Sequence, residues 1–301
     1  MNHLVKLTGI CIPAILTASL ASGLQSPPTG PYLGQRPPGE EFVRFAPGIV
    51  PDGMMTGVTV SPDGKEIYWA TRDGIYVTRL EDGQWTTPAV ASFSGISKSA
   101  FYDEAPVISP DNRTMFFSSR RPYGSYRGSD WRYWRVERTE AGWAEPQPLP
   151  EIINSRFGGH FQLSVADSGT LYFANILNDQ SVIYYSRLVD GAYTEPEPLE
   201  EINSFGHVFC PFVAPDESYI IFNVYDESLN FSEGYYISFR GEEGQWLKPQ
   251  LLCRNSSRIG SFVTRDGKYI FCIQTWASAE IIEKLRPKAD EESASEKRAA
   301  P

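Results

Sequence analysis

The feature that most constrains the fold of this chain is a turn signal that recurs five times at nearly equal spacing. Each copy centres on an aspartate, and successive aspartates lie 48, 56, 49 and 50 residues apart. The copies are Ser61-Pro62-Asp63-Gly64, Ser109-Pro110-Asp111-Asn112, Val165-Ala166-Asp167-Ser168-Gly169, Ala214-Pro215-Asp216-Glu217 and Thr264-Arg265-Asp266-Gly267. An aspartate stabilises a tight turn by accepting hydrogen bonds from nearby backbone, and glycine or asparagine tolerates the left-handed position after it. Self-similarity at this period indicates one supersecondary unit per copy.

Apolar runs flank every turn. Those that follow it are Ile67-Tyr68-Trp69, Met115-Phe116-Phe117, Leu171-Tyr172-Phe173, Ile220-Ile221-Phe222 and Ile270-Phe271-Cys272. A strand that is apolar on both faces has to be covered on both faces, as an inner strand of a propeller blade is by its two neighbours. Shorter runs before the turns predict the innermost strand of each blade; they are Thr59-Val60, Val107-Ile108, Leu163-Ser164, Phe212-Val213 and Phe262-Val263.

The second half of the repeat predicts an outer strand. Four copies carry an aromatic residue followed three positions later by proline, namely Trp85/Pro88, Trp143/Pro146, Tyr193/Pro196 and Trp246/Pro249. Proline cannot donate to a sheet, so it marks an edge strand. The repeat therefore predicts an all-β fold, a β-propeller of four-stranded blades over residues 41–287. Five turn signals favour five blades, and six blades stay open as an alternative.

The fifth copy is incomplete, because it stops before an aromatic-proline strand. We expect the segment Glu41–Phe45, which precedes the first full repeat, to supply the missing outer strand. Such a closure joins the two ends of the chain in one blade and removes the last open sheet edge.

The two ends of the chain differ from the repeats. Residues 1–23 are typical of a signal peptide, with Lys6 ahead of an apolar run and cleavage expected near Ala21–Gly23. Residues 24–40 are rich in proline and glycine and predict an extended linker. Residues 288–301 are charged and without periodicity, which predicts a disordered tail. The chain is therefore expected to be secreted or periplasmic, with no membrane span.

Composition and motifs exclude several classes of function. The net charge of −10 argues against a nucleic-acid partner, because phosphate binding needs a basic surface. The chain has no phosphate-binding loop, no His-Glu-x-x-His motif and no serine nucleophile elbow, so neither a cofactor nor a metal is predicted. Three cysteines remain after the signal peptide, Cys210, Cys253 and Cys272, so at most one disulfide forms within the chain. The sequence does not decide whether one forms.

These residues resemble the WD40-like (PD40) repeat proteins related to the propeller of TolB. Besides the turns, the resemblance rests on Pro31–Gln35, Phe45–Val50, Ala214–Tyr219 and Ala279–Pro287, and it covers residues 31–288. It implies a propeller exported in bacteria that serves as a binding or scaffold module. TolB-type propellers have six blades, whereas five turns are counted here. An acidic pair usual in that group is present as Asp103-Glu104 but replaced in the third and fourth repeats by Gly159-His160 and Gly206-His207.

One candidate site lies at a mouth of the predicted channel. His160 and His207 each precede an innermost strand, as do Asp103 and Glu104. Histidine and carboxylate side chains that converge there would suit acid-base chemistry or a metal. The alternative is that both histidines lie in loops and form only local hydrogen bonds.

A second candidate site is an Arg- and aromatic-rich stretch in the second repeat. Its members in the predicted loop are Arg120, Arg121, Tyr123, Tyr126, Arg127 and Trp131. Aromatic rings offer faces for sugars, and arginine binds carboxylates with two parallel hydrogen bonds. An acidic glycan or an acidic protein surface would suit this stretch. The alternative is a strand whose aromatic residues are buried and whose arginines extend over them.

Taken together, the sequence predicts a non-catalytic secreted or periplasmic propeller that binds a protein or a cell-envelope glycan. It is expected to be a monomer or a subunit of an envelope complex. Two alternatives are a glycan-active hydrolase with its site at the channel mouth and a TolB-like subunit of an envelope complex. Catalysis has little support, because a five-bladed glycosidase needs carboxylates from several inner strands that meet in the channel, and only Asp103 and Glu104 qualify.

Overall fold

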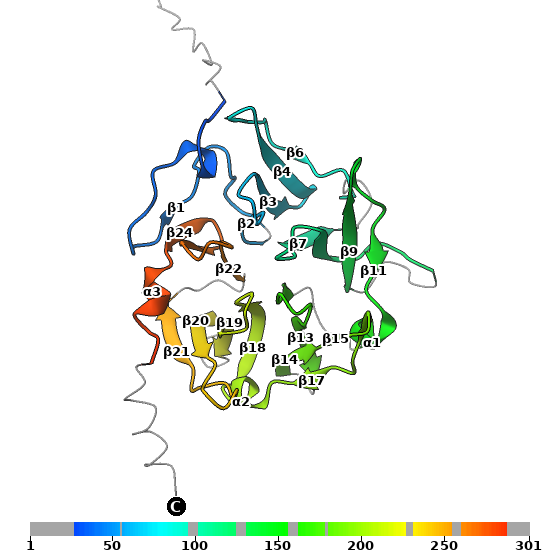
Figure 1. The fold of residues 1–301 in the computed structure, drawn as a ribbon, viewed down its shortest axis with the longest axis vertical. Coiled ribbons are helices and arrows are strands. Elements are labelled where there is room, and N and C mark those ends of the chain that lie inside the picture. Colours follow the sequence, from blue (N-terminus) through cyan, green and yellow to red (C-terminus); the bar gives the residue numbers. More distant parts are fainter. Residues whose placement is uncertain are drawn as a thin grey trace, which may run out of the picture.

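The protein folds into a ring of five radial β-sheets around a central axis (Figure 1). The computed structural model describes residues 27–54, 56–95, 102–124, 131–155, 162–177, 180–226, 231–254 and 260–287. The predicted signal peptide at residues 1–23 and the predicted tail at residues 288–301 lie outside these ranges. The ring confirms the predicted all-β propeller, with five blades rather than six.

Each blade contains four strand positions connected in antiparallel order from the channel outward. Blade 1 consists of β2 (Thr59–Val60), β3 (Glu66–Thr71), β4 (Gly74–Glu81) and a split outer strand, β5 (Gln84–Trp85) and β6 (Ala89–Val90). Blade 2 consists of β7 (Asp103–Ile108), β8 (Thr114–Ser119), β9 (Arg132–Thr139) and the split pair β10 (Gly142–Trp143) and β11 (Gln147–Pro148). In both blades the proline-marked segment lies at the outer edge, where a missing donor costs no ladder hydrogen bond.

The next two blades follow the same plan. Blade 3 consists of β12 (Ser164–Val165), β13 (Leu171–Leu177), β14 (Gln180–Ser186) and β17 (Glu197–Pro198), with an added hairpin of β15 (Leu188–Val189) and β16 (Ala192–Tyr193). Blade 4 consists of β18 (His207–Val213), β19 (Tyr219–Asp226), β20 (Phe231–Phe239) and β21 (Gln250–Cys253). The short helices are η1 (Tyr32–Gly34), α1 (Glu151–Asn154), α2 (Glu200–Asn203) and α3 (Glu280–Glu283). No helix within the described ranges has the length and hydropathy needed to cross a membrane.

Blade 5 is completed by the N-terminal part of the chain, as the sequence predicts. Its own strands are β22 (Ser261–Val263), β23 (Tyr269–Cys272) and β24 (Thr275–Ser278), and β1 (Val43–Arg44) pairs antiparallel with β24 at the outer position (Figure 1). Phe45 is fully buried and meets the rings of Phe271 and Trp276 edge-on, with centroids 5.0 and 5.1 Å away. Apolar burial therefore adds to the hydrogen bonds that hold the closure.

The repeated aspartates serve as turn residues. Asp63 accepts a hydrogen bond from the hydroxyl of Ser61 at 2.6 Å and from the backbone N–H of Lys65 at 3.1 Å. Asp111 and Asp266 accept the same pair of bonds in their own turns. The spacing of the repeat therefore follows from local backbone chemistry, and these residues need no role in function.

The hydrophobic core consists of clusters between neighbouring blades. Between blades 1 and 2, for example, Tyr68 and Ile75 share a buried cluster with Met115 and Phe117. Comparable clusters lie at the other four junctions, including the one between blades 5 and 1. This explains why the inner strands are apolar on both faces.

The described part of the predicted linker lies against the propeller. The backbone N–H of Trp85 donates to the carbonyl of Pro28 at 2.8 Å, and its indole N–H donates to the carbonyl of Gly30 at 2.7 Å. Leu33 is buried in the cluster between blades 5 and 1. Residues 29–37 therefore pass along the junction of the first and last blades and form one wall of the cleft described below.

Candidate functional site

The topology gives the ring two different faces. All five innermost strands run in the same direction, so the residues that begin them, such as Asp103 and His207, lie on one face, here the strand-start face. The five aspartate turns lie on the opposite face, here the turn face. Among the described residues, no group of three or more His, Cys, Asp or Glu side chains is placed to hold a metal ion.

Asp103, at the start of β7, is a buried carboxylate that accepts three hydrogen bonds. Its side chain is 2 % exposed and accepts hydrogen bonds from the backbone N–H of Gly95 at 2.7 Å and the hydroxyl of Ser94 at 3.0 Å. The guanidinium of Arg121 donates to the same oxygen at 2.5 Å. Three donors therefore meet on one oxygen of this carboxylate, and charge-assisted hydrogen bonds of this kind are the strong ones.

The guanidinium of Arg121 also makes several contacts. It lies over the rings of Phe117 and Trp134, 5.1 and 5.2 Å from their centroids. It also donates to the carbonyl of Phe93 at 3.2 Å. The structure therefore brings together Asp103 and Arg121, which the sequence placed in separate candidate sites. Their bonds to Phe93, Ser94 and Gly95 attach blade 2 to the segment that arrives from blade 1.

Glu104 differs from its neighbour. Its side chain is also 2 % exposed, and its Oε2 atom has no hydrogen-bond partner in the part of the chain that the structure describes. Burial raises the pKa of this carboxyl to about 8. The register of β7 shifts directly after it, at Ala105 with φ 53°, which is a bulge that redirects the strand. Glu104 is therefore a neutral acid near pH 7.

The strand-start end of the channel is partly filled by Gln162. Its side-chain N–H group donates to the carbonyl of Ser261 at 2.8 Å. Gln162 precedes β12 in blade 3 and Ser261 begins β22 in blade 5, two blades that are not neighbours. The bond therefore spans the channel mouth from blade 3 to blade 5.

The remaining candidates on this face are only partly described. Arg120 lies over the ring of Trp131, with 5.8 Å between the guanidinium carbon and the centroid. Tyr123 is 46 % exposed and meets Trp134 edge-on at 5.6 Å, while His207 meets Tyr225 edge-on at 6.1 Å. Tyr126, Arg127 and His160 lie outside the described residues. A ligand surface formed by these side chains stays a prediction.

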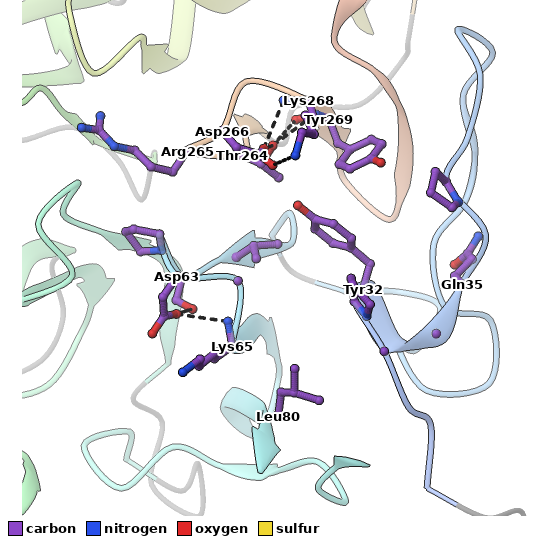
Figure 2. Close-up of a pocket in the computed structure, with 18 of the residues that line it drawn as sticks. Tyr32, Gln35, Asp63, Lys65, Leu80, Thr264, Arg265, Asp266, Lys268 and Tyr269 are labelled. Atoms are coloured by element: carbon purple, nitrogen blue, oxygen red, sulfur yellow. Dashed lines mark hydrogen bonds and ion pairs between the residues drawn. The ribbon is translucent and has the colours of Figure 1, made fainter. Parts of the chain in front are cut away.

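The turn face carries a cleft that the sequence did not reveal. It lies between blades 1 and 5, has a volume of about 710 Å³, and is called the blade 1–5 cleft here (Figure 2). Residues 29–37, the aspartate turns of blades 1 and 5, and Leu80 of β4 form it. Tyr32 and Tyr269 face each other edge to face at one side, with ring centroids 4.9 Å apart.

Tyr32 is fixed in this wall. Its hydroxyl is hydrogen-bonded to Thr264, and burial together with the nearby carboxylate of Asp266 raises its pKa to about 12. The residue is therefore neutral and offers an aromatic face with a polar tip, a combination that suits contact with a partly polar ligand.

Positive charge predominates in the blade 1–5 cleft, although the chain as a whole carries −10. The cationic lining residues are Arg36, Lys65, Arg265 and Lys268, against the two carboxylates of Asp63 and Asp266.

The four cationic side chains differ in whether they form an ion pair. Lys268 pairs with Asp266 at 3.0 Å, and Arg265 pairs with Asp167 at 3.1 Å. Arg36 and the ammonium group of Lys65 form no ion pair with any described residue. Two cationic side chains in the cleft are thus available to an external anion.

The sequence carried only a faint signal for this cleft. The lining residues belong to segments at opposite ends of the chain, and they meet only because β1 closes blade 5. Basic residues adjoin the first and last aspartate turns, at Lys65, Arg265 and Lys268. That pattern, combined with the predicted closure, would have indicated a positively charged junction.

Comparisons with known proteins find only distant structural likenesses. No family model and no curated protein sequence matches the chain. Solved structures that are similar include one assigned as TolB from Agrobacterium tumefaciens, with 16% identity, a TM-score of 0.43 and coverage of 71% of this chain and 68% of that one.

Two further structures are similar at the same level. TolB from Acinetobacter baumannii has 13% identity and a TM-score of 0.46, and the match covers 71% of this chain and 47% of that one. A periplasmic gluconolactonase from Pseudomonas aeruginosa has 12% identity and a TM-score of 0.39, with 71% and 63% covered. This chain therefore matches only about half the length of the Acinetobacter protein, and likenesses this distant do not bear on what it binds.

Proposed function

We propose that this protein is a non-catalytic binding module, secreted or periplasmic, whose ligand occupies the blade 1–5 cleft. The observation that carries the proposal is the pair of unpaired cations, Arg36 and Lys65, in an open cleft beside the aromatic wall of Tyr32 and Tyr269. Protein sites that bind small or elongated ligands combine an apolar wall with a few polar groups in this way.

The charges in the cleft favour an anionic ligand. The guanidinium of Arg36 is suited to a carboxylate, which it can bind with two parallel hydrogen bonds. The two tyrosines that line the cleft are aromatic side chains of the kind on which sugar rings pack. We therefore favour a cell-envelope glycan that carries carboxylates over an acidic protein segment.

Binding measurements with matched ligands test this proposal. Isothermal titration with oligo-galacturonate and with a neutral oligosaccharide of equal length should show binding of the acidic one. Replacing Arg36 and Lys65 together by alanine should weaken that binding roughly 10- to 100-fold, because two charge-assisted hydrogen bonds are lost.

A matched control uses two exposed cations away from the cleft, as Arg72→Ala with Lys248→Ala. This double variant carries the same charge change and should bind like the wild type. Equal loss in both double variants would mean that overall charge, not the cleft, governs binding. Binding of an acidic peptide but of no glycan would transfer the proposal to a protein ligand.

A glycan-active hydrolase at the channel mouth is the second candidate. The neutral carboxyl of Glu104 favours it, since a raised pKa suits a general acid. Against it, glycoside hydrolysis needs a second carboxylate, and Asp103 is occupied by three donors. Hydrolysis of a chromogenic glycoside, lost on Glu104→Gln, would establish the enzyme.

A role as a subunit of an envelope complex, like that of TolB, is the third candidate. It rests on the resemblance of the repeats and on the predicted signal peptide. A pull-down from envelope extracts with the wild type and with the Arg36→Ala/Lys65→Ala variant would test it. A partner that both proteins capture would use a surface other than the cleft.

A further inference from the structure

Two of the three cysteines outside the predicted signal peptide lie side by side at the junction of blades 4 and 5. The thiols of Cys253 and Cys272 are hydrogen-bonded to one another; Cys272 belongs to the core cluster between blades 4 and 5, and Cys253 packs against that cluster. All three described cysteines are free thiols in this structure. A thiol pair in contact is the arrangement from which a disulfide forms with little movement of the backbone.

The pair lies where blade 4 meets blade 5, the blade that closes the ring. Cys253 is the last residue of β21, the outer strand of blade 4, and Cys272 is the last residue of β23 in blade 5. The chain after Cys253 leads to β22, the innermost strand of blade 5. We propose that Cys253 and Cys272 form an interblade disulfide when the protein meets a disulfide donor, and that this bond fixes the closing blade to blade 4.

The two thiols differ in the way that such a reaction requires. Cys253 is partly exposed and accepts the hydrogen bond of its neighbour, which lowers the pKa of its thiol. Cys272 is 1 % exposed, and burial raises the pKa of its thiol. Cys253 is therefore the sulfur that attacks first, and Cys272 is the one that completes the bond.

The reaction is a balanced thiol-disulfide exchange. The Cys253 thiolate attacks one sulfur of the donor, which breaks the donor's S–S bond and releases one donor thiolate. The released thiolate takes the proton of Cys272, and the Cys272 sulfur then attacks the mixed disulfide at Cys253. The second donor thiol leaves, so the two cysteines are oxidised and the donor is reduced to two thiols.

Cys210 is not a competitor for this bond. It lies in β18 with φ 51°, is buried, and its sulfur accepts hydrogen bonds from the backbone of Gln162 and Gly260. Burial raises the pKa of its thiol to about 12, so it is a poor nucleophile. Of the three disulfide pairings that the sequence left open, the structure thus favours the one between Cys253 and Cys272.

The bond would stabilise the part of the ring that depends on the N-terminal strand. Blade 5 receives its outer strand from β1, near the other end of the chain, so its completion depends on a contact between distant segments that the other blades do not need. A cross-link between Cys253 and Cys272 restricts the unfolded chain in this region. For a loop of this length and a protein of this size, the melting temperature should rise by roughly 5–10 °C.

The test is to equilibrate the full chain in glutathione buffers of graded redox ratio and map each cysteine by differential alkylation and peptide mass. We expect a peptide joining Cys253 to Cys272 that is lighter by two hydrogen atoms than the separate thiols, with Cys210 still reduced. The oxidised protein should melt above the reduced one. The fourth cysteine of the chain, Cys11, lies within the predicted signal peptide at residues 1–23, and its peptide is read separately.

Two variants make the outcome decisive. Cys253→Ser, at the partly exposed position, should melt at the same temperature in both buffers, while Cys210→Ala should keep the oxidation-dependent rise. Absence of the Cys253–Cys272 peptide at every ratio, or a cross-link through Cys210, would overturn the proposal. The result does not depend on which ligand the blade 1–5 cleft binds.

Discussion

The strand-start face and the turn face of the ring use charged residues in opposite ways. On the strand-start face, Asp103 and Arg121 neutralise each other beneath the surface, and Glu104 is buried as a neutral acid. On the turn face, Arg36 and Lys65 are exposed and line an open cleft, without an ion-pair partner among the described residues. Charges that a fold needs are paired or neutral, whereas charges kept unpaired in a cleft are available for a ligand.

The largest effect should come from removing the segment on which the cleft and the closure both depend. Deletion of residues 24–48 removes β1, Phe45 and the wall that carries Tyr32. Loss of the buried phenylalanine alone is worth about 3–5 kcal/mol, so the melting temperature should fall by roughly 10 °C or more. Differential scanning calorimetry measures this. Deletion of residues 288–301, which are predicted to be disordered, is the control and should leave the melting temperature unchanged. An unchanged melting temperature after deletion of residues 24–48 would contradict the closure of blade 5 by β1.

The next largest effect tests whether the strand-start charges serve the fold. Asp103→Ala leaves Arg121 without its carboxylate in a largely buried place, which should lower the free energy of unfolding by about 3–5 kcal/mol. Urea denaturation measures the change. Asp52→Ala removes an ion pair to Arg44 of 3.0 Å whose carboxylate is exposed, and it should cost less than about 1 kcal/mol. Similar costs in the two variants would break the contrast between the faces.

Glu104 predicts a particular dependence of stability on pH. Its pKa is about 8 in the folded protein and near the ordinary 4.5 in the unfolded chain. For an acid whose folded pKa is raised, stability is greatest below pH 4.5, decreases as the pH rises to 8 and is level above that. The loss by pH 7 is on the order of 3 kcal/mol.

Glu104→Gln removes this slope while keeping the shape of the side chain. The free energies of unfolding of the wild type and the variant, compared between pH 5 and pH 8, should therefore diverge, with the variant less sensitive to pH. Stability curves that stay parallel would show that the pKa of Glu104 is not raised on folding. The carboxyl would then be charged at neutral pH, and the contrast between the two faces would be weaker.

Much of the fold could be predicted because it rests on local chemistry. The aspartate turns, such as the one at Asp63, depend on hydrogen bonds between residues two apart, which a sequence displays directly. The closure by Val43–Arg44 followed from counting: four complete repeats and one without an outer strand require a donor from elsewhere in the chain.

The candidate sites were harder to predict from the sequence because they depend on contacts between distant segments. Nothing local marks the bulge at Ala105 that accompanies the burial of Glu104, nor the reach of Arg121 back to Asp103. The blade 1–5 cleft combines residues from both ends of the chain, and Arg36 falls in a stretch whose composition resembles a linker. Cys253 and Cys272 likewise meet only once two blades are packed together.

The smallest expected effect is also the sharpest test of what the cleft is for. Because Arg36 and Lys65 have no ion-pair partner among the described residues, their joint replacement by alanine should change the free energy of unfolding by less than about 0.5 kcal/mol. The same variant should lose affinity for an acidic oligosaccharide, and the wild-type affinity should decrease as salt is added, because exposed charges are screened. Urea denaturation and titration at two ionic strengths measure both quantities on one preparation. If stability fell by as much as it does for Asp103→Ala, these cations would serve the fold, and the difference between the two faces would disappear.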